Sequence, residues 1–341
     1  MVKKNRISKC AATALTILSF VLTASVGARA LDLVPVGRAV GIELSCDGVL
    51  VAGLAKVKSA EGECSPASDA GIAPGDIIVM VSGTKIGSAE DFLKIARDFT
   101  DAPVSVTLKR GEKLIQYTVT PAEDAEGARK LGLMLRDGVS GIGTVTFYDP
   151  ATGLYGALGH AINDSDTGVL MPLGEGFITS ASVADVKRGV SGTPGELHGA
   201  FDAEAKLGTI LRNTGCGIFG RMDSAPEGVT TRAAASADIR TGPAVILAQV
   251  KGSATAEYDI EVSRVYRGGE EQLTLTVTDP ELLALTGGIV QGMSGCPILQ
   301  NGKLIGAVTH VLLSDPTRGY GVTISSMLAA AEGCLPSKSA A

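Results

Sequence analysis

The stretch Gly292-Met293-Ser294-Gly295-Cys296-Pro297 decides how this sequence of 341 residues is interpreted. A serine among two glycines and a proline predicts a sharp turn, because glycine adopts backbone angles that other residues avoid. The backbone N–H groups of such a turn converge on one point, where they stabilise the negative charge that develops in acyl transfer. Gly-Ser pairs are also common in plain loops, so the surrounding sequence has to decide between a reactive serine and an ordinary turn.

The residues on either side of this turn favour a reactive serine. Residues 297–300 and 303–310 read as two strands joined by Asn301-Gly302, a typical hairpin turn. His160 ends a short apolar strand, residues 154–159, and precedes Ser294 in the chain. A lone histidine is more often structural, but the sequence holds only three. We therefore predict Ser294 as the nucleophile, His160 as its general base, and the N–H groups of Gly292 and Ser294 as the oxyanion hole.

Residues 34–121 have the pattern of a separate α+β unit. Residues 38–44 and 49–54 read as strands on either side of a turn, and residues 77–81 as a buried strand. A helix is expected to begin at Ser88, which can form a capping box with Asp91. Two strands around Arg110-Gly111-Glu112 complete the unit, and the polar residues 122–130 are predicted as a linker.

This unit resembles a PDZ domain of the kind associated with bacterial proteases. The resemblance implies that an extended peptide, bound by its C-terminus, adds as a strand between residues 38–44 and the helix of residues 88–99. It makes Val40, Gly41 and Ile42 the predicted peptide-binding residues. A purely structural β-domain is the alternative.

The turn at Ser294 resembles the Gly-x-Ser-Gly-Gly-Pro turn of trypsin-like serine proteases. Longer stretches, among them Phe147-Tyr148-Asp149-Pro150 and residues 156–160, 287–295 and 302–310, resemble the stage IV sporulation protein B family of serine peptidases. The resemblance covers almost the whole chain. It implies a mainly β protein, in which an N-terminal PDZ-like α+β domain precedes a trypsin-like two-β-barrel peptidase domain at residues 131–336.

The family resemblance also implies that Asp279 is the third catalytic residue. Asp279 precedes Pro280 and could instead cap the turn there, while Asp185 and Asp202 lie nearer the chain position at which trypsin-like proteases carry their acid. Cys296 stands where the family usually has serine, and it is not at the nucleophile position. Met293 replaces the aspartate that trypsin-like enzymes use for activation, so activation is expected to follow another route.

The resemblance implies an exported endopeptidase that acts between the two membranes around a developing spore. It implies that the enzyme cleaves itself and a membrane-associated sporulation regulator, and so triggers sigma-factor activation between the two cell compartments. Two alternatives stay open, a non-catalytic PDZ signalling adaptor and a general extracytoplasmic quality-control protease.

The N-terminus and the composition set limits on these functions. Residues 1–30 begin with a segment that holds four basic residues, continue with an uncharged stretch and end in Ala28-Arg29-Ala30. This pattern predicts a signal peptide or a signal anchor that could attach the chain to a membrane. The net charge of −6 gives no basic footprint for nucleic acid. With three histidines and no paired cysteine motif, neither a metal nor a cofactor is expected. One disulfide, Cys46–Cys64, or separate thiols are both open.

Overall fold

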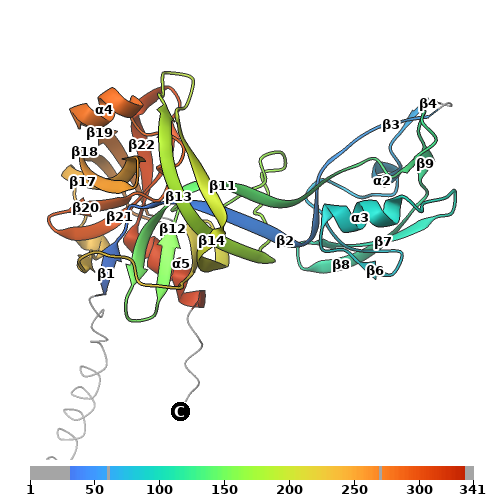
Figure 1. Ribbon diagram of the computed structural model, residues 1–341, viewed down its shortest axis with the longest axis horizontal. Helices are drawn as coiled ribbons and strands as arrows, with labels where there is room; N and C mark the ends of the chain where they lie inside the picture. Colours follow the sequence, from blue (N-terminus) through green and yellow to red (C-terminus); the bar gives the residue numbers. More distant parts are fainter. Residues whose placement is uncertain (1–30, 60–61, 269–270, 335–341) are drawn as a thin grey trace, which may run out of the picture.

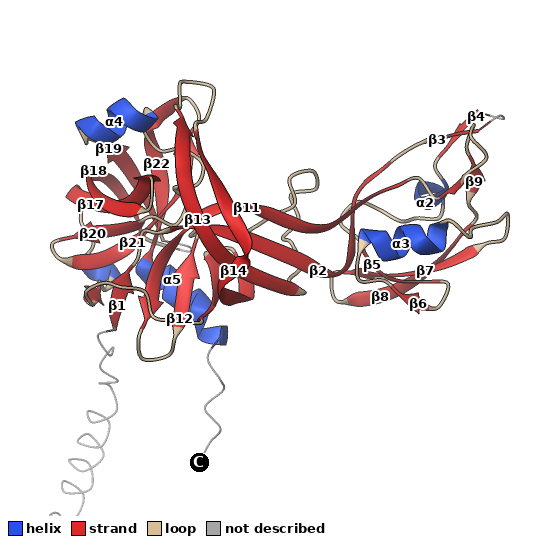
Figure 2. Ribbon diagram, viewed as in Figure 1, coloured by secondary structure: helices blue, strands red, loops and turns tan. Residues whose placement is uncertain are grey.

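The computed structural model describes residues 31–59, 62–268 and 271–334. The predicted signal segment, residues 1–30, lies outside the described residues. Strands dominate the fold and form a large part and a small part, joined by a narrow waist (Figures 1 and 2). None of the helices in the described ranges is long and apolar enough to span a membrane.

Six strands of the large part close into a first barrel, because each pairs with the next and the last pairs with the first. Its interior is filled by apolar side chains such as Val40, Tyr155 and Ile178. In the order of their pairing, the strands are β2 (Ala39–Leu54), β11 (Leu133–Asp149), β12 (Leu154–Ala157), β15 (Gly217–Met222), β14 (Glu196–Thr214) and β13 (Glu175–Lys187).

Six further strands close into a second barrel in the same way. Buried residues alternate with exposed ones along β18, as expected for a strand with one face toward a core. The strands are β17 (Gly242–Lys251), β18 (Ala254–Tyr266), β19 (Gln272–Val277), β22 (Asp315–Thr323), β21 (Lys303–Leu312) and β20 (Pro297–Gln300). Outside the rings lie β1 (Asp32–Pro35), β16 (Thr231–Ala233), α4 (Pro280–Thr286), α5 (Ile324–Ala331) and the 3-10 turns Ser236–Asp238 and Glu332–Cys334.

The small part is the unit that resembles a PDZ domain, and it has its own core around Ile78, Phe92 and Val106. The helix predicted from Ser88 is confirmed, since the Ser88 hydroxyl caps α3 by accepting from the N–H of Asp91. Its elements are β3 (Val57–Ser59), β4 (Gly62–Cys64), α2 (Pro66–Asp69), β5 (Ile77–Val81), β6 (Thr84–Lys85), α3 (Ala89–Ala96), β7 (Val104–Arg110), β8 (Lys113–Val119), β9 (Ala122–Glu123) and β10 (Arg129–Lys130).

Strands β2 and β11 run through the waist and belong to both domains (Figure 1). The sequence predicted two strands and a turn at residues 46–48, but the structure has one strand, β2, of 16 residues. The first residues of β2 pair with β11 and β13 in the first barrel, so the PDZ domain does not begin at residue 34. The PDZ domain is instead an insertion between two barrel strands, and the predicted linker forms the small β9–β10 hairpin.

Candidate active site

A cavity of about 630 Å³ lies between the two barrels and brings the predicted nucleophile and base together. The first barrel contributes His160, which follows β12, and the second contributes Ser294, which precedes β20. Both side chains line this one cavity although 134 residues separate them in the chain. The return strand β21 adds Thr309 and His310 to its wall.

The nucleophile turn, residues 292–297, is held by the first barrel. Thr144 of β11 donates its N–H to the carbonyl of Ser294 over 2.9 Å and its hydroxyl to the carbonyl of Gly292 over 2.8 Å. Thr146 donates to the carbonyl of Gly295 over 2.7 Å. At Gly295 φ is +98°, and a Cβ would lie 2.0 Å from the Thr144 carbonyl, so only glycine fits there. The turn is therefore rigid, and the two barrels hold it jointly.

The predicted oxyanion hole is compatible with this turn. Gly292 has a φ of +96°, which only glycine adopts readily. Across the described ranges, neither its N–H nor that of Ser294 donates to a protein oxygen. Both donors therefore remain available to a substrate oxyanion. The assignment of Gly292 and Ser294 to the oxyanion hole stays a prediction.

Ser294 and His160 each form a hydrogen bond with a backbone carbonyl group. The Ser294 hydroxyl donates to the carbonyl of Thr309 over 2.6 Å. Nδ1 of His160 lies 2.8 Å from the carbonyl of Ala161, so this nitrogen carries the proton and Nε2 keeps its lone pair. A neutral imidazole with a free Nε2 is the form that can accept the serine proton. Catalysis then requires the Ser294 hydroxyl to turn from Thr309 toward His160.

His310 is a member of the site to which the sequence analysis gave no catalytic role. Its ring packs on the ring of His160, with 4.6 Å between the centroids. Burial lowers the pKa of His160, its contact with Ala161 partly opposes that shift, and the charge of His310 lowers the pKa further. Burial also lowers the pKa of His310. In the sequence, only the position of His310 at the end of the return strand indicated that it could lie near the site.

Asp279 is not brought to His160. It is the N-cap of α4, where one carboxylate oxygen accepts from the N–H of Leu282 over 2.9 Å and the other from the N–H of Asp259 over 3.3 Å. This is the capping alternative that the sequence left open. Among the described residues, no aspartate or glutamate lines the cavity, which also leaves out Asp185 and Asp202. The catalytic role of Asp279 stays a prediction.

Cys296 lies within the nucleophile turn but is not poised for attack. Its side chain is buried, and burial raises its pKa to about 12, so the thiol keeps its proton at neutral pH. Cys46 is likewise buried, and Cys46 and Cys64 form no disulfide with each other. Separate thiols were one of the two alternatives.

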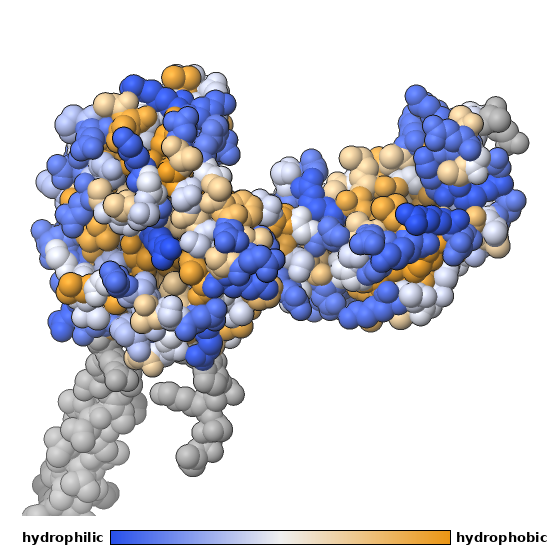
Figure 3. All heavy atoms as spheres, in the orientation of Figure 1, coloured by the Kyte–Doolittle hydropathy of each residue, from blue (hydrophilic) through white to orange (hydrophobic). Residues whose placement is uncertain are grey.

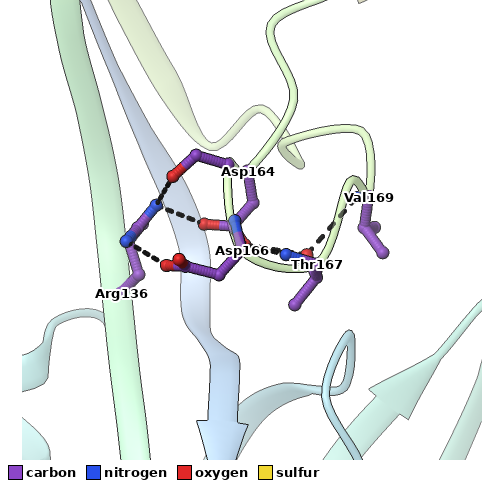
Figure 4. A network of polar contacts seen from close by, with 6 residues as sticks. Arg136, Asp164, Asp166, Thr167 and Val169 are labelled. Carbon is purple, nitrogen blue, oxygen red and sulfur yellow. Dashed lines mark hydrogen bonds and ion pairs between the residues drawn. The ribbon is translucent and has the colours of Figure 1, made fainter.

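A second feature that the sequence did not predict holds the histidine loop, residues 161–171 (Figure 4). Arg136 of β11 donates to the buried carboxylate of Asp164 over 2.6 Å and to Asp166 over 2.5 Å. Burial raises the pKa of Asp164, but hydrogen bonds from Thr167 and the charge of Arg136 outweigh burial, so its pKa is lowered and the carboxylate is ionised. This ion pair attaches the loop that follows His160 to β11, the strand that leads out of the PDZ domain.

The predicted peptide-binding residues are wrong. Val40, Gly41 and Ile42 pair with β11 along one edge of β2 and with β13 along the other, inside the first barrel. A peptide strand has no free edge to join there. In the PDZ domain the helix α3 faces the start of β11 instead, and the N–H of Ala89 donates to Asp137 over 2.8 Å.

A cavity of about 510 Å³ marks the place between α3 and the start of β11. The helix lines it with Phe92, Leu93 and Ala96, and the segment of residues 131–133 forms another wall. Lys58 also lines it and takes part in no ion pair within the described part of the chain. Figure 3 shows the hydrophobic residues on this view of the PDZ domain. The helix thus lies beside β11 and not beside Val40, Gly41 and Ile42, and its role in peptide binding stays a prediction.

Comparison with known proteins gives two family matches. The model for SpoIVB peptidase S55 matches residues 127–328, more than half of the chain, and a PDZ domain model matches residues 59–110. No curated protein sequence matches the chain.

Three solved structures are among the similar ones. The PDZ domain of the SdrC-like protein from Listeria monocytogenes is 26% identical and covers 27% of this chain and 90% of its own, with a TM-score of 0.22. The active form of the Rv3671c protease from M. tuberculosis is 14% identical. The match covers 57% of this chain and 73% of that protease chain, with a TM-score of 0.37. The HtrA-type protease AlgW with decapeptide is 14% identical. The match covers 60% of this chain and 56% of the AlgW chain, with a TM-score of 0.33.

Proposed function

Because the chain belongs to the SpoIVB peptidase S55 family and is a serine peptidase with a PDZ domain, we propose that it is a signalling endopeptidase of sporulation. In this proposal it cleaves itself and a membrane-associated regulator, and cleavage of the regulator leads to sigma-factor activation. The observation that carries the peptidase activity is the single cavity in which Ser294 and His160, from two barrels, lie with His310.

The resting arrangement of the serine supports a regulated enzyme. Ser294 donates to Thr309 and not to His160, so its hydroxyl must turn before it can attack. A protease that waits for a partner benefits from such a state, whereas a general quality-control protease would act on unfolded chains without one. The bonds from Thr144 keep the turn itself intact, which supports activity over the alternative of a non-catalytic adaptor.

We assign recognition of the substrate in part to the PDZ cavity beside α3. Its apolar helix face and the available charge of Lys58 are suited to an extended peptide that ends in a carboxylate. This replaces the binding site that the sequence analysis placed at Val40, Gly41 and Ile42.

The proposed location rests on sequence alone. Residues 1–30 have the basic and apolar segments of an export signal, so we place the peptidase outside the cytoplasmic membrane, in the space between the two membranes around the spore. If the segment is retained as an anchor, the enzyme stays near a membrane-bound substrate.

Expression in a spore-forming bacterium that lacks its own peptidase of this family tests the proposal. The chain is expected to restore a reporter driven by the late sigma factor and to yield shorter forms of itself, as is the variant Cys296→Ser. Ser294→Ala is expected to do neither. Restoration by Ser294→Ala would support the adaptor, and broad loss of unfolded proteins without the reporter signal would support the quality-control protease.

A further inference from the structure

One edge of β11 is open from the PDZ cavity to the active site. Along its other edge β11 pairs with β2 over residues 133–144. The opposite edge of β11 begins to pair with β12 only at Val145, so the edge of residues 133–143 is the open part. Across the described ranges, no other backbone hydrogen bond reaches residues 133–143. An open strand edge presents unpaired N–H and C=O groups, which can accept another strand.

The burial of side chains along β11 changes at nearly the same place as the pairing. Residues 133–142 of β11 are all exposed or partly exposed, whereas residues 143–149 are all buried. The exposed part begins with Leu133, which lines the PDZ cavity, and ends with Ile142, which lines the catalytic cavity. The two cavities are therefore the two ends of one accessible strand edge.

The middle of this edge is anchored in both domains. Register shifts mark irregularities on either side of Arg136, and such bulges redirect side chains. Asp137 accepts from the first residue of α3, and Arg136 holds the histidine loop through Asp164. The edge is thus tied to the groove helix and to the loop of the catalytic base within two consecutive residues.

Strand polarity decides how a substrate would lie on this edge. β11 runs from the PDZ cavity toward Ser294, so a peptide that pairs with it in the antiparallel sense runs from Ser294 toward the PDZ cavity. The residues after the scissile bond then occupy the edge, and the C-terminus arrives beside α3. This is the direction that C-terminal recognition by a PDZ domain requires.

We propose that the open edge of β11, residues 133–142, is one continuous track for the segment of a polypeptide substrate that follows the scissile bond. Ile142 lies nine residues after Leu133, and an extended strand of that length spans about 30 Å. The peptidase therefore selects the bond that lies roughly ten residues before a C-terminus held in the PDZ cavity. This inference rests on the proposed peptidase function and adds the geometry of its substrate.

A mixture of peptides from a proteome digest, incubated with the whole chain, tests the track. Mass spectrometry of the new fragments gives the length of each C-terminal product. We expect these lengths to cluster near ten residues, whatever the sequence at the cut. Synthetic versions of a cleaved peptide, shortened or lengthened by six residues after the cut, should be cleaved on the order of 10²-fold more slowly, as expected when two linked sites cannot both be filled.

Two exposed leucines of the PDZ domain provide a matched pair of variants. Leu93 lines the PDZ cavity and is 57% exposed, whereas Leu114 on β8 is 70% exposed and lies outside that cavity. Leu93→Glu should abolish the clustering of product lengths, and Leu114→Glu should retain it, while thermal unfolding shows that both fold.

Each result is decisive. Cleavage by the wild-type chain with widely scattered product lengths, or clustering that survives Leu93→Glu, would overturn the track but leave the peptidase intact. Absence of any cleavage that depends on Ser294 would overturn the proposed function itself, and the track with it.

Discussion

The nucleophile turn and the histidine loop are both parts of the active site, but they are built differently. The turn is mostly buried, and Thr144 and Thr146 of the other barrel hold it through three hydrogen bonds. The histidine loop is mostly exposed between residues 163 and 170. It is held at its ends by Asn213, which bonds Ile162 and Met171, and in its middle by Arg136.

This difference indicates where the enzyme can be regulated. The turn is buried and leaves no room for a Cβ at Gly295, so its backbone holds Ser294 in a prepared position and only the hydroxyl has to turn. The histidine loop depends on a side chain of β11, the strand that also borders the PDZ groove. Both parts are attached to β11, but at different places. The histidine loop is attached at Arg136, in the exposed part of the strand beside the PDZ domain, whereas the nucleophile turn is attached at Thr144 and Thr146, in its buried part.

Removal of either predicted catalytic side chain should have the largest effect. Ser294→Ala and His160→Ala are each expected to lower kcat/KM by at least about 10³-fold, because the two groups act as a unit. Cys296→Ser should retain activity, since its buried thiol does not attack. Cleavage assays with a peptide found in the digest would measure this. Loss of activity in Cys296→Ser alone would contradict the assignment of the nucleophile.

Breaking the anchor of the histidine loop should have the next largest effect. Arg136→Ala leaves the buried carboxylate of Asp164 without its cation, which is expected to cost about 1–3 kcal/mol of unfolding free energy. Denaturant unfolding measures it. The control Lys85→Ala removes an exposed pair with Asp47 and should cause no measurable change. Equal stability of Arg136→Ala and the control would show that the loop does not depend on this ion pair.

The sequence predicted the local parts of the molecule better than its connections. The hairpin at Asn301-Gly302 was predictable because both turn residues adopt positive φ. The long strands β2 and β11 were not, because the register that places Val40 and Ile42 in a barrel is set by pairing with residues about 100 and 140 positions away. The contact of Arg136 with Asp164 also joins two segments without a local pattern.

Substitution of Asp279 should have a smaller effect, and two variants separate its capping role from a catalytic role. Because its carboxylate caps α4, Asp279→Ala should lower the unfolding free energy by about 1 kcal/mol, and Asp279→Ser, which keeps a capping oxygen, should recover most of that loss. Capping alone predicts that activity follows stability in both variants. If the serine variant is stable yet inactive, Asp279 has the catalytic role that the family resemblance implies, and the loop around α4 must rearrange during catalysis.

His310 should produce the smallest effect, on the pH profile. Only neutral His160 can accept a proton, and burial lowers its pKa from the ordinary value of histidine. Activity should therefore rise with pH along a limb that lies at lower pH than an ordinary histidine would give, and should then level off. His310→Ala removes a neighbouring positive charge and opens the cavity, so the pKa of His160 should rise and the limb should move to higher pH. His198→Ala, on β14 beside Glu196, is the control and should leave the limb in place. A shift to lower pH in His310→Ala would contradict this electrostatic account.

Labelling with a fluorophosphonate tests most directly that the prepared serine and the adjustable histidine form one catalytic pair. The whole chain is treated with the probe at several pH values, and the modified peptide is identified by mass spectrometry. We predict a single adduct on Ser294, formed faster as His160 loses its proton and almost absent in His160→Ala. An adduct on another residue, or labelling of Ser294 at an undiminished rate in His160→Ala, would contradict the account.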